Sequence, residues 1–250
     1  MPRVQQRKVR IFIHRQPCVQ TARNFMNRVW NDKVTEAVTN VMTSRTVIES
    51  PLQLSVGSDS FCETIRVWQR AFPTLEYKES HVIICKNDIV IEWSVKGKHL
   101  GEFLGVAATG KDLVYQGSSQ LTFVNNKVSY YVSVVDTQSI LSQLMGRYTT
   151  RTEPLKPRSA SEELYAVIPQ LLSPFLTLRQ VECLSLSTLN LSVKEVAATL
   201  NIKDSSVQTH LKRAFELLNV SNKKMFMAYI CENNTIELLI RMGLYLKQSI

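Results

Sequence analysis

Residues 192–218 read SVKEVAATLNIKDSSVQTHLKRAFELL, and this stretch decides the fold of the last third of the chain. Ser192 and Glu195 have the spacing of a capping box, in which each side chain bonds the backbone N–H of the other residue. A helix is therefore expected to begin after Ser192. A short connection follows at 201–204, and Asp204 can cap a second helix. The stretch predicts two helices that meet across a tight turn.

The second of these helices is expected to have one apolar and one polar side. At about 100° per residue the apolar positions share one side, and they are Val207, Leu211, Ala214, Phe215 and Leu218. The opposite side carries Ser205, Thr209, Lys212, Arg213 and Glu216, while Gln208 and His210 flank the boundary. This arrangement is typical of a helix-turn-helix, whose second helix enters the major groove of DNA. Spacing alone equally fits an amphipathic helix with a solvated face.

A longer match separates these two readings. The matching positions are Leu176, Thr177, Arg179, Leu184, the run 194–197, Leu200, Ile202, Val207, His210, Leu211, Leu218 and Val220. With them, residues 176–220 resemble the LuxR/GerE-type DNA-binding domain of bacterial transcription regulators. Four positions depart from that pattern. Gln180 replaces a glutamate, Asn190 a turn glycine, Lys203 a capping serine and Leu217 a common lysine, and the last change weakens a phosphate contact.

The resemblance implies which side chains touch DNA. Gln208, Thr209 and Lys212 would face the bases. The residues expected to contact phosphate or to position the helix are Lys194, Ser205, Ser206, His210, Arg213 and Lys223. For His210 a packed histidine on the flank of the helix is an equal alternative. Because two recognition helices spaced by one DNA turn read a two-fold site, a homodimer on double-stranded DNA is expected.

The front part of the chain has helical patterns first and strand patterns after them. Apolar stripes at helical spacing run from Ala22 to Trp30 and from Phe61 to Phe72. Residues 80–95 then alternate in polarity, and two further strands flank the turn at Asn125 and Asn126. Helices followed by strands predict an α+β domain, with helices on one face of a curved antiparallel sheet.

This part resembles the SnoaL-like family, which is related to polyketide cyclases and steroid isomerases and has a cone-shaped α+β fold. The resembling stretches are 28–32, 70–77, 86–113 and 123–136, and Gln143, Leu144 and Gly146 fit the closing signature. The family can use an acidic residue with a nearby histidine as acid and base. At the acidic position this chain has Ser118 and Ser119, which cannot act as a base alone. We therefore expect no catalytic residues and a non-catalytic module that senses a ligand, dimerises, or does both.

The resemblance implies a cavity inside the cone for a small apolar or aromatic ligand. Its candidate lining residues are Trp30, Trp68, Trp93, His99, Phe103 and Tyr131, although each aromatic among them also fits a plain core position. The alternative function is a cyclase- or isomerase-type enzyme fused to a DNA-binding domain. A phosphoacceptor receiver does not fit, because helices and strands do not alternate around a central aspartate.

Composition agrees with a DNA-binding protein of the cytoplasm. The chain has 250 residues and a net charge of +9, which favours an anionic partner. Its five cysteines are widely spaced without a C-x-x-C pair, so neither a disulfide framework nor a zinc site is expected. No apolar run is long enough to span a membrane, and no metal or cofactor is expected.

Three segments follow from these patterns. Residues 1–146 form the SnoaL-like domain, whose first 15 residues are a basic arm that is either solvated or bound to phosphate. Residues 147–173 read as a linker with a short helix, since Pro154 and Pro157 lie among threonine, serine and arginine. Residues 174–250 form the all-α helix-turn-helix domain, which ends in an extra helix.

Overall fold

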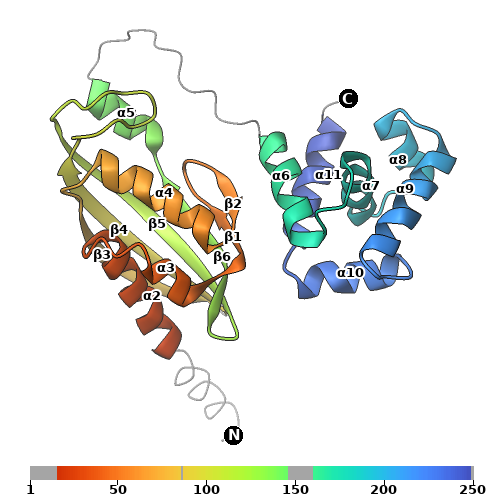
Figure 1. The fold of residues 1–250 in the computed structure, drawn as a ribbon, viewed down its shortest axis with the longest axis horizontal. Helices are drawn as coiled ribbons and strands as arrows, with labels where there is room; N and C mark the ends of the chain where they lie inside the picture. The colour runs from red at the N-terminus through yellow and green to blue at the C-terminus, as the bar shows by residue number, and fades with distance from the viewer. Residues whose placement is uncertain (1–15, 86, 146–159, 249–250) are drawn as a thin grey trace, which may run out of the picture. The chain divides into compact units, whose positions relative to one another are not determined.

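The computed structural model describes residues 16–85, 87–145 and 160–248. The chain divides into two compact units, 1–157 and 158–250, whose described parts Figure 1 draws in red to green and in blue-green to blue. The expected basic arm, residues 1–15, lies outside the described residues, and so do residues 147–159 of the expected linker.

The first unit is an α+β domain, as predicted. Its elements in chain order are α2 (Gln16–Trp30), α3 (Ala37–Val41), β1 (Met42–Glu49), β2 (Leu54–Val56), α4 (Ser58–Ala71), β3 (Glu76–Cys85), β4 (Asp88–Lys98), β5 (Asp112–Val124), β6 (Lys127–Val135) and α5 (Thr137–Met145). The strands form one six-stranded sheet in the order β2-β1-β6-β5-β4-β3.

One detail of the sheet differs from the expectation. β1 pairs with β6 in parallel, so the sheet is mixed, whereas all other neighbours are antiparallel. Alternating polarity predicts which face of a strand is buried, but it carries no information on the partner strand. The parallel pair joins the first strand of the domain to the last, and α4 with four strands lies between them in the sequence.

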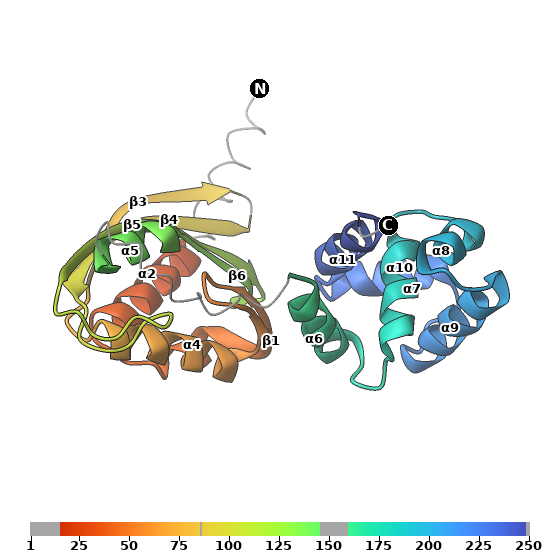
Figure 2. The same ribbon diagram turned by 90° about the horizontal axis from the view of Figure 1, so that it is seen from above.

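The core of this domain lies between the sheet and its helices. Figure 2 shows the sheet curving around α2 and α4. The predicted helical stripes supply the buried side: Phe25, Met26 and Ile65 are at most 2% exposed. They pack on strand residues such as Ile91 and Leu121, both fully buried in the same cluster. The alternating burial along β4 shows that its other face remains outside this core.

The second unit is all helical. Its elements are α6 (Ala160–Leu172), α7 (Leu178–Thr188), α8 (Val193–Leu200), α9 (Asp204–Leu217), α10 (Lys223–Glu232) and α11 (Ile236–Gln248). The expected capping box of Ser192 and Glu195 is present at the start of α8. A second capping box joins Thr177 and Gln180 at the start of α7, so glutamine does the work of the usual glutamate.

The turns around α8 use left-handed backbone at asparagine, whose short polar side chain tolerates this conformation. Asn190, which replaces the usual glycine, has a φ of 59°, and Asn201 ends α8 with a φ of 53°. The expected cap at Asp204 is wrong. The N-cap is Lys203, and its side chain makes no capping bond. Asp204 is the first helical residue, where a carboxylate still interacts favourably with the helix dipole.

Two helices enlarge the helix-turn-helix domain. α6 lies within the range expected to be a linker, yet it packs on α7 and α11 and so belongs to the second unit. α11 lies along α7 with Leu238, Leu239 and Met242 fully buried. The last helix therefore covers the core of this unit.

We predict that Gly243→Ala destabilises the second unit by about 1–2 kcal/mol, because overpacking outweighs the better helix propensity of alanine. A Cβ on Gly243 would lie 2.8 Å from the backbone oxygen of Ser185 and 3.0 Å from the Leu189 side chain. Urea unfolding followed by far-ultraviolet circular dichroism measures the effect. All three tryptophans lie in the first unit, so the transition seen by tryptophan fluorescence should stay unchanged.

The control is Leu244→Ala, because Leu244 is the next residue of α11 and is 48% exposed. Equal effects of the two substitutions would contradict the close packing of α7 and α11.

Candidate functional site

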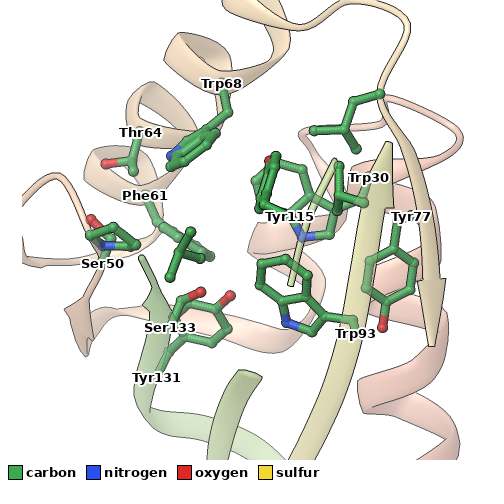
Figure 3. A pocket seen from close by; sticks show the side chains of 14 residues that line it. Trp30, Ser50, Phe61, Thr64, Trp68, Tyr77, Trp93, Tyr115, Tyr131 and Ser133 are labelled. Atoms are coloured by element: carbon green, nitrogen blue, oxygen red, sulfur yellow. The ribbon is translucent and has the colours of Figure 1, made fainter. Parts of the chain in front are cut away.

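A cavity of about 30 Å³ lies in the first unit between the helices and the curved sheet (Figure 3). Aromatic rings make up much of its wall. Its lining residues are Trp30, Ser50, Pro51, Phe61, Thr64, Trp68, Leu75, Tyr77, Trp93, Val95, Tyr115, Tyr131, Ser133 and Val135. Four of the six residues expected from the sequence are among them: Trp30, Trp68, Trp93 and Tyr131.

The other two expected residues do not line this cavity. Phe103 packs against Trp68, with ring centroids 4.6 Å apart, and against Phe72. His99 follows the end of β4, where its ring lies 5.3 Å from that of Phe72. Both belong to the loop after β4, and this loop packs behind the cavity wall that Trp68 forms.

His99 organises that loop instead. The backbone N–H of Thr109 donates to His99 Nδ1 at 3.2 Å, so the ring proton resides on Nε2. The backbone of His99 also bonds Lys111 and Gly110. Burial lowers the pKa of His99 and favours the neutral ring. The histidine thus makes hydrogen bonds that hold the loop, and within the described part of the chain its buried Nε2 has no hydrogen-bond partner.

A hydrogen-bonded cluster connects three lining residues, Trp93, Tyr131 and Ser133, through Ser119, which does not itself line the cavity. Trp93 Nε1–H donates to Ser119 Oγ at 3.0 Å, and Ser119 Oγ lies 3.0 Å from the Tyr131 hydroxyl. Ser133 is paired with Ser119 on the neighbouring strand β6, and the two Oγ atoms lie 3.5 Å apart. Ser119 is fully buried. Ser119 therefore connects side chains of β4, β5 and β6. Ser119 stands where the family resemblance implies an acidic residue.

A glycine makes room for this cluster. Gly117 of β5 lies opposite Trp93 of β4. A Cβ on Gly117 would lie 2.6 Å from the indole ring, which is closer than van der Waals contact permits. The indole can therefore lie across β5 and reach Ser119 only because residue 117 has no side chain.

Among the described residues that line the cavity, none changes charge near neutral pH. The titratable side chains in this described lining are Tyr77, Tyr115 and Tyr131. Burial raises the pKa of all three above the usual value of 10, so they remain protonated phenols. The wall can donate and accept hydrogen bonds and can stack on rings, but it offers neither a carboxylate nor an imidazole.

Sequence reasoning missed several lining residues, of which Tyr77, Tyr115 and Ser133 are the most informative. The alternation of side chains along the strands could have predicted that Tyr115 and Ser133 face the cavity. Tyr115 lies opposite Val95 in the pairing of β4 and β5, and Ser133 is two residues from Tyr131 on the same face of β6. Tyr77 is near the start of β3, and its buried hydroxyl has no hydrogen-bond partner.

The candidate DNA-contacting residues gather on the second unit. α9 packs on α7 and α8 through Val207 and Ala214, which are both fully buried. Seven of the nine expected residues are exposed and two are half-buried. The exposed ones are Lys194, Ser205, Gln208, Thr209, Lys212, Arg213 and Lys223, and the half-buried ones are Ser206 and His210. None of these side chains is enclosed in the protein interior.

The outer face of α9 is also hollowed. A groove lies along it, lined by Gln208, Leu211, Lys212, Phe215, Glu216, Asn219, Val220 and Ser221. Two of the expected base-facing residues, Gln208 and Lys212, are one turn apart at its edge. Lys223 Nζ donates to Asn190 Oδ1 at 3.3 Å, which ties the start of α10 to the turn before α8.

Comparison with protein-family models identifies both units. The family described as SnoaL-like polyketide cyclase matches residues 20–144, half of the chain. The chain belongs to the SnoaL-like family. Its second unit matches the family described as bacterial regulatory proteins, luxR family, over residues 174–229. This SnoaL-like protein thus carries a DNA-binding domain of a transcription regulator, and α6 and α11 lie outside the matched range.

Several solved structures are similar to the SnoaL-like domain. A protein described as a SnoaL-like polyketide cyclase, from Jannaschia sp. CCS1, is 18% identical, with 53% of this chain and 94% of that chain covered and a TM-score of 0.50. AclR from Streptomyces galilaeus, described as a hydroxylase, is 21% identical, with 51% and 95% covered and a TM-score of 0.47. At 18% identity the likeness to the Jannaschia protein shows the fold alone. Comparison with the curated proteins finds no match.

Two further features of the described residues bear on the site. Within 16–85, 87–145 and 160–248, no cluster of three or more His, Cys, Asp or Glu has the arrangement of a metal site. In the same ranges no helix combines the length and the apolar character needed to cross a membrane.

We predict that Ser119→Ala destabilises the SnoaL-like domain by about 1–3 kcal/mol, because it leaves the buried Trp93 N–H without its acceptor. Urea unfolding followed by tryptophan fluorescence reports on this domain. Ser118→Ala is the matched control, since the neighbouring serine is half-buried on the other face of β5. A Ser119→Ala variant as stable as Ser118→Ala would show that the cluster contributes nothing.

Proposed function

We propose that this SnoaL-like protein is a sequence-specific DNA-binding transcription regulator whose first domain is a non-catalytic module. In this proposal α9 is the recognition helix. The first domain binds a small, uncharged apolar or aromatic ligand, and the protein acts as a homodimer in the bacterial cytoplasm. The observation that carries the proposal is the pairing of a charge-free aromatic cavity with an exposed polar helix face on one chain.

The outer face of α9 supports the DNA-binding part. Gln208 and Lys212 have the side chains that pair with adenine and guanine edges in the major groove. Arg213, Lys194 and Lys223 are exposed around them and can neutralise phosphates. Glu216 is the exposed acid of this face, one turn beyond Lys212, and it would limit how far along α9 the phosphate backbone can approach.

The cavity chemistry supports the non-catalytic part. General acid–base catalysis needs a group whose pKa lies near the working pH. The lining phenols do not meet this need, because burial moves their pKa values upward. A carboxylate at position 119 would also be buried against Trp93 and Tyr131, two residues of the cavity wall. Serine at this position binds the indole N–H without bringing a charge into the cavity.

The alternative is a cyclase- or isomerase-type enzyme fused to a DNA-binding domain, and one observation favours it. The Tyr131 hydroxyl, held by Ser119, lies in the cavity wall and is an uncharged hydrogen-bond donor of the kind that stabilises an enolate. The cavity lining lacks a base to form that enolate. Turnover is therefore the measurement that separates the two functions.

A homodimer agrees with the geometry of helix-turn-helix recognition, since a two-fold protein reads two half-sites one helical turn apart. Light scattering of the full-length protein with and without DNA tests this part. A monomer at micromolar concentration in both conditions would contradict it.

We predict that Lys212→Ala weakens binding to an operator duplex selected from a random library by about 1–3 kcal/mol. The variant should also have a weaker base preference, because a base contact is lost. Fluorescence anisotropy with labelled duplexes, together with footprinting, measures both effects. Lys78→Ala is the control, since Lys78 is an exposed lysine on β3 of the first domain. Unchanged affinity and footprint in the Lys212 variant would reject α9 as the recognition helix.

We predict that the protein returns its ligand unaltered. Native mass spectrometry of protein purified from its own host should show a retained small molecule whose mass is unchanged after release. Candidate polyketide-like and steroid-like ring compounds should quench tryptophan fluorescence on binding, because Trp30, Trp68 and Trp93 line the cavity. Conversion of any such compound at a rate that Tyr131→Phe abolishes would establish the enzyme instead.

A further inference from the structure

We infer that Thr209 recognises a thymine through its methyl group and not through its hydroxyl. The inference rests on the proposed function, since it requires α9 to lie in the major groove of DNA. It goes further by assigning the chemistry of one contact and a base in each half-site.

The hydroxyl of Thr209 is already engaged within the protein. Its Oγ1–H donates to the backbone oxygen of Ser205, one turn earlier in α9, at 2.8 Å. A hydroxyl has a single proton, so this group can offer a base only its lone pairs. Donating to guanine or to thymine O4 would require breaking the bond within the helix.

The same hydrogen bond orients the rest of the side chain. Threonine in a helix has few χ1 choices, and the bond to the carbonyl four residues earlier selects one of them. With Oγ1 held against the helix backbone, the methyl group occupies the outer position. Thr209 is exposed and lies nearly opposite the fully buried Val207, so this methyl group is near the middle of the outer face.

The neighbours of Thr209 complete the contact. Lys212 and Arg213 are exposed on either side of it and carry long polar side chains. Between two such side chains, a short branched residue leaves an apolar patch facing the duplex. Among the four bases, thymine alone has a methyl group at the edge of the major groove, and a threonine methyl is one of its known partners. The geometry therefore assigns a thymine opposite Thr209.

The test uses full-length protein and duplexes selected from a random library. In the selected duplex, each thymine is replaced in turn by uracil, which pairs identically but lacks the 5-methyl group. Wild-type protein should bind about fourfold less tightly when one particular thymine of a half-site is replaced, which is the effect of one buried methyl group. Replacement at the other positions should have less effect.

Two variants separate the methyl group from the hydroxyl. Thr209→Val keeps the methyl group and removes the hydroxyl, so it should retain both affinity and the preference for thymine over uracil. Thr209→Ser keeps the hydroxyl and its bond to Ser205 but removes the methyl group, so it should lose that preference. Far-ultraviolet circular dichroism checks that both variants fold.

The opposite pattern, with serine discriminating and valine not, would overturn the inference. So would equal binding of thymine and uracil duplexes by the wild-type protein, and in that case the proposed function would still stand. If no sequence is enriched and the protein binds no duplex, the proposed function fails and this inference fails with it.

Discussion

The burial of one side of α9 is the constraint on which the second domain depends. Val207 and Ala214 are fully enclosed against α7 and α8, and this fixes the rotation of α9 about its axis. Capping boxes at Thr177 and Ser192 fix where α7 and α8 begin. Once these helices are set, the rotation of α9 leaves Gln208, Thr209 and Lys212 outward. The polar face is thus a consequence of packing on the opposite side.

In the SnoaL-like domain a comparable constraint comes from hydrogen bonding across the sheet. Ser119 satisfies the Trp93 N–H and bonds the Tyr131 hydroxyl, so three neighbouring strands share one polar cluster. A buried N–H left without a partner costs more than the bond itself contributes. A carboxylate in the same place would have to be desolvated or protonated. Serine therefore keeps the strands together while leaving the cavity without charge.

The sequence predicts the buried face of a helix or strand better than it predicts the element against which that face packs or the strand with which it pairs. The stripes from Ala22 and from Phe61 identify α2 and α4 and their buried sides, because helical periodicity reflects burial directly. The parallel pairing of β1 with β6 has no such local signal. No local signal shows which side chains line the cavity either. Trp68 and Phe103 are in ring contact, yet of these two only Trp68 lines the cavity. The cap at Lys203 and the packing of α6 and α11 likewise depend on tertiary contacts.

The size of the cavity sets a condition on how a sensor of this kind would work. About 30 Å³ is room for water and not for a drug-sized molecule, whose sites measure about 300–1,000 Å³. A ligand can enter only if side chains of the wall move, and Trp30 at the end of α2 is a lining residue that is already half-buried. Binding and displacement of the wall are then one event. A ligand that requires a different wall necessarily shifts the conformational equilibrium of the domain, and this coupling needs no chemical change in the ligand.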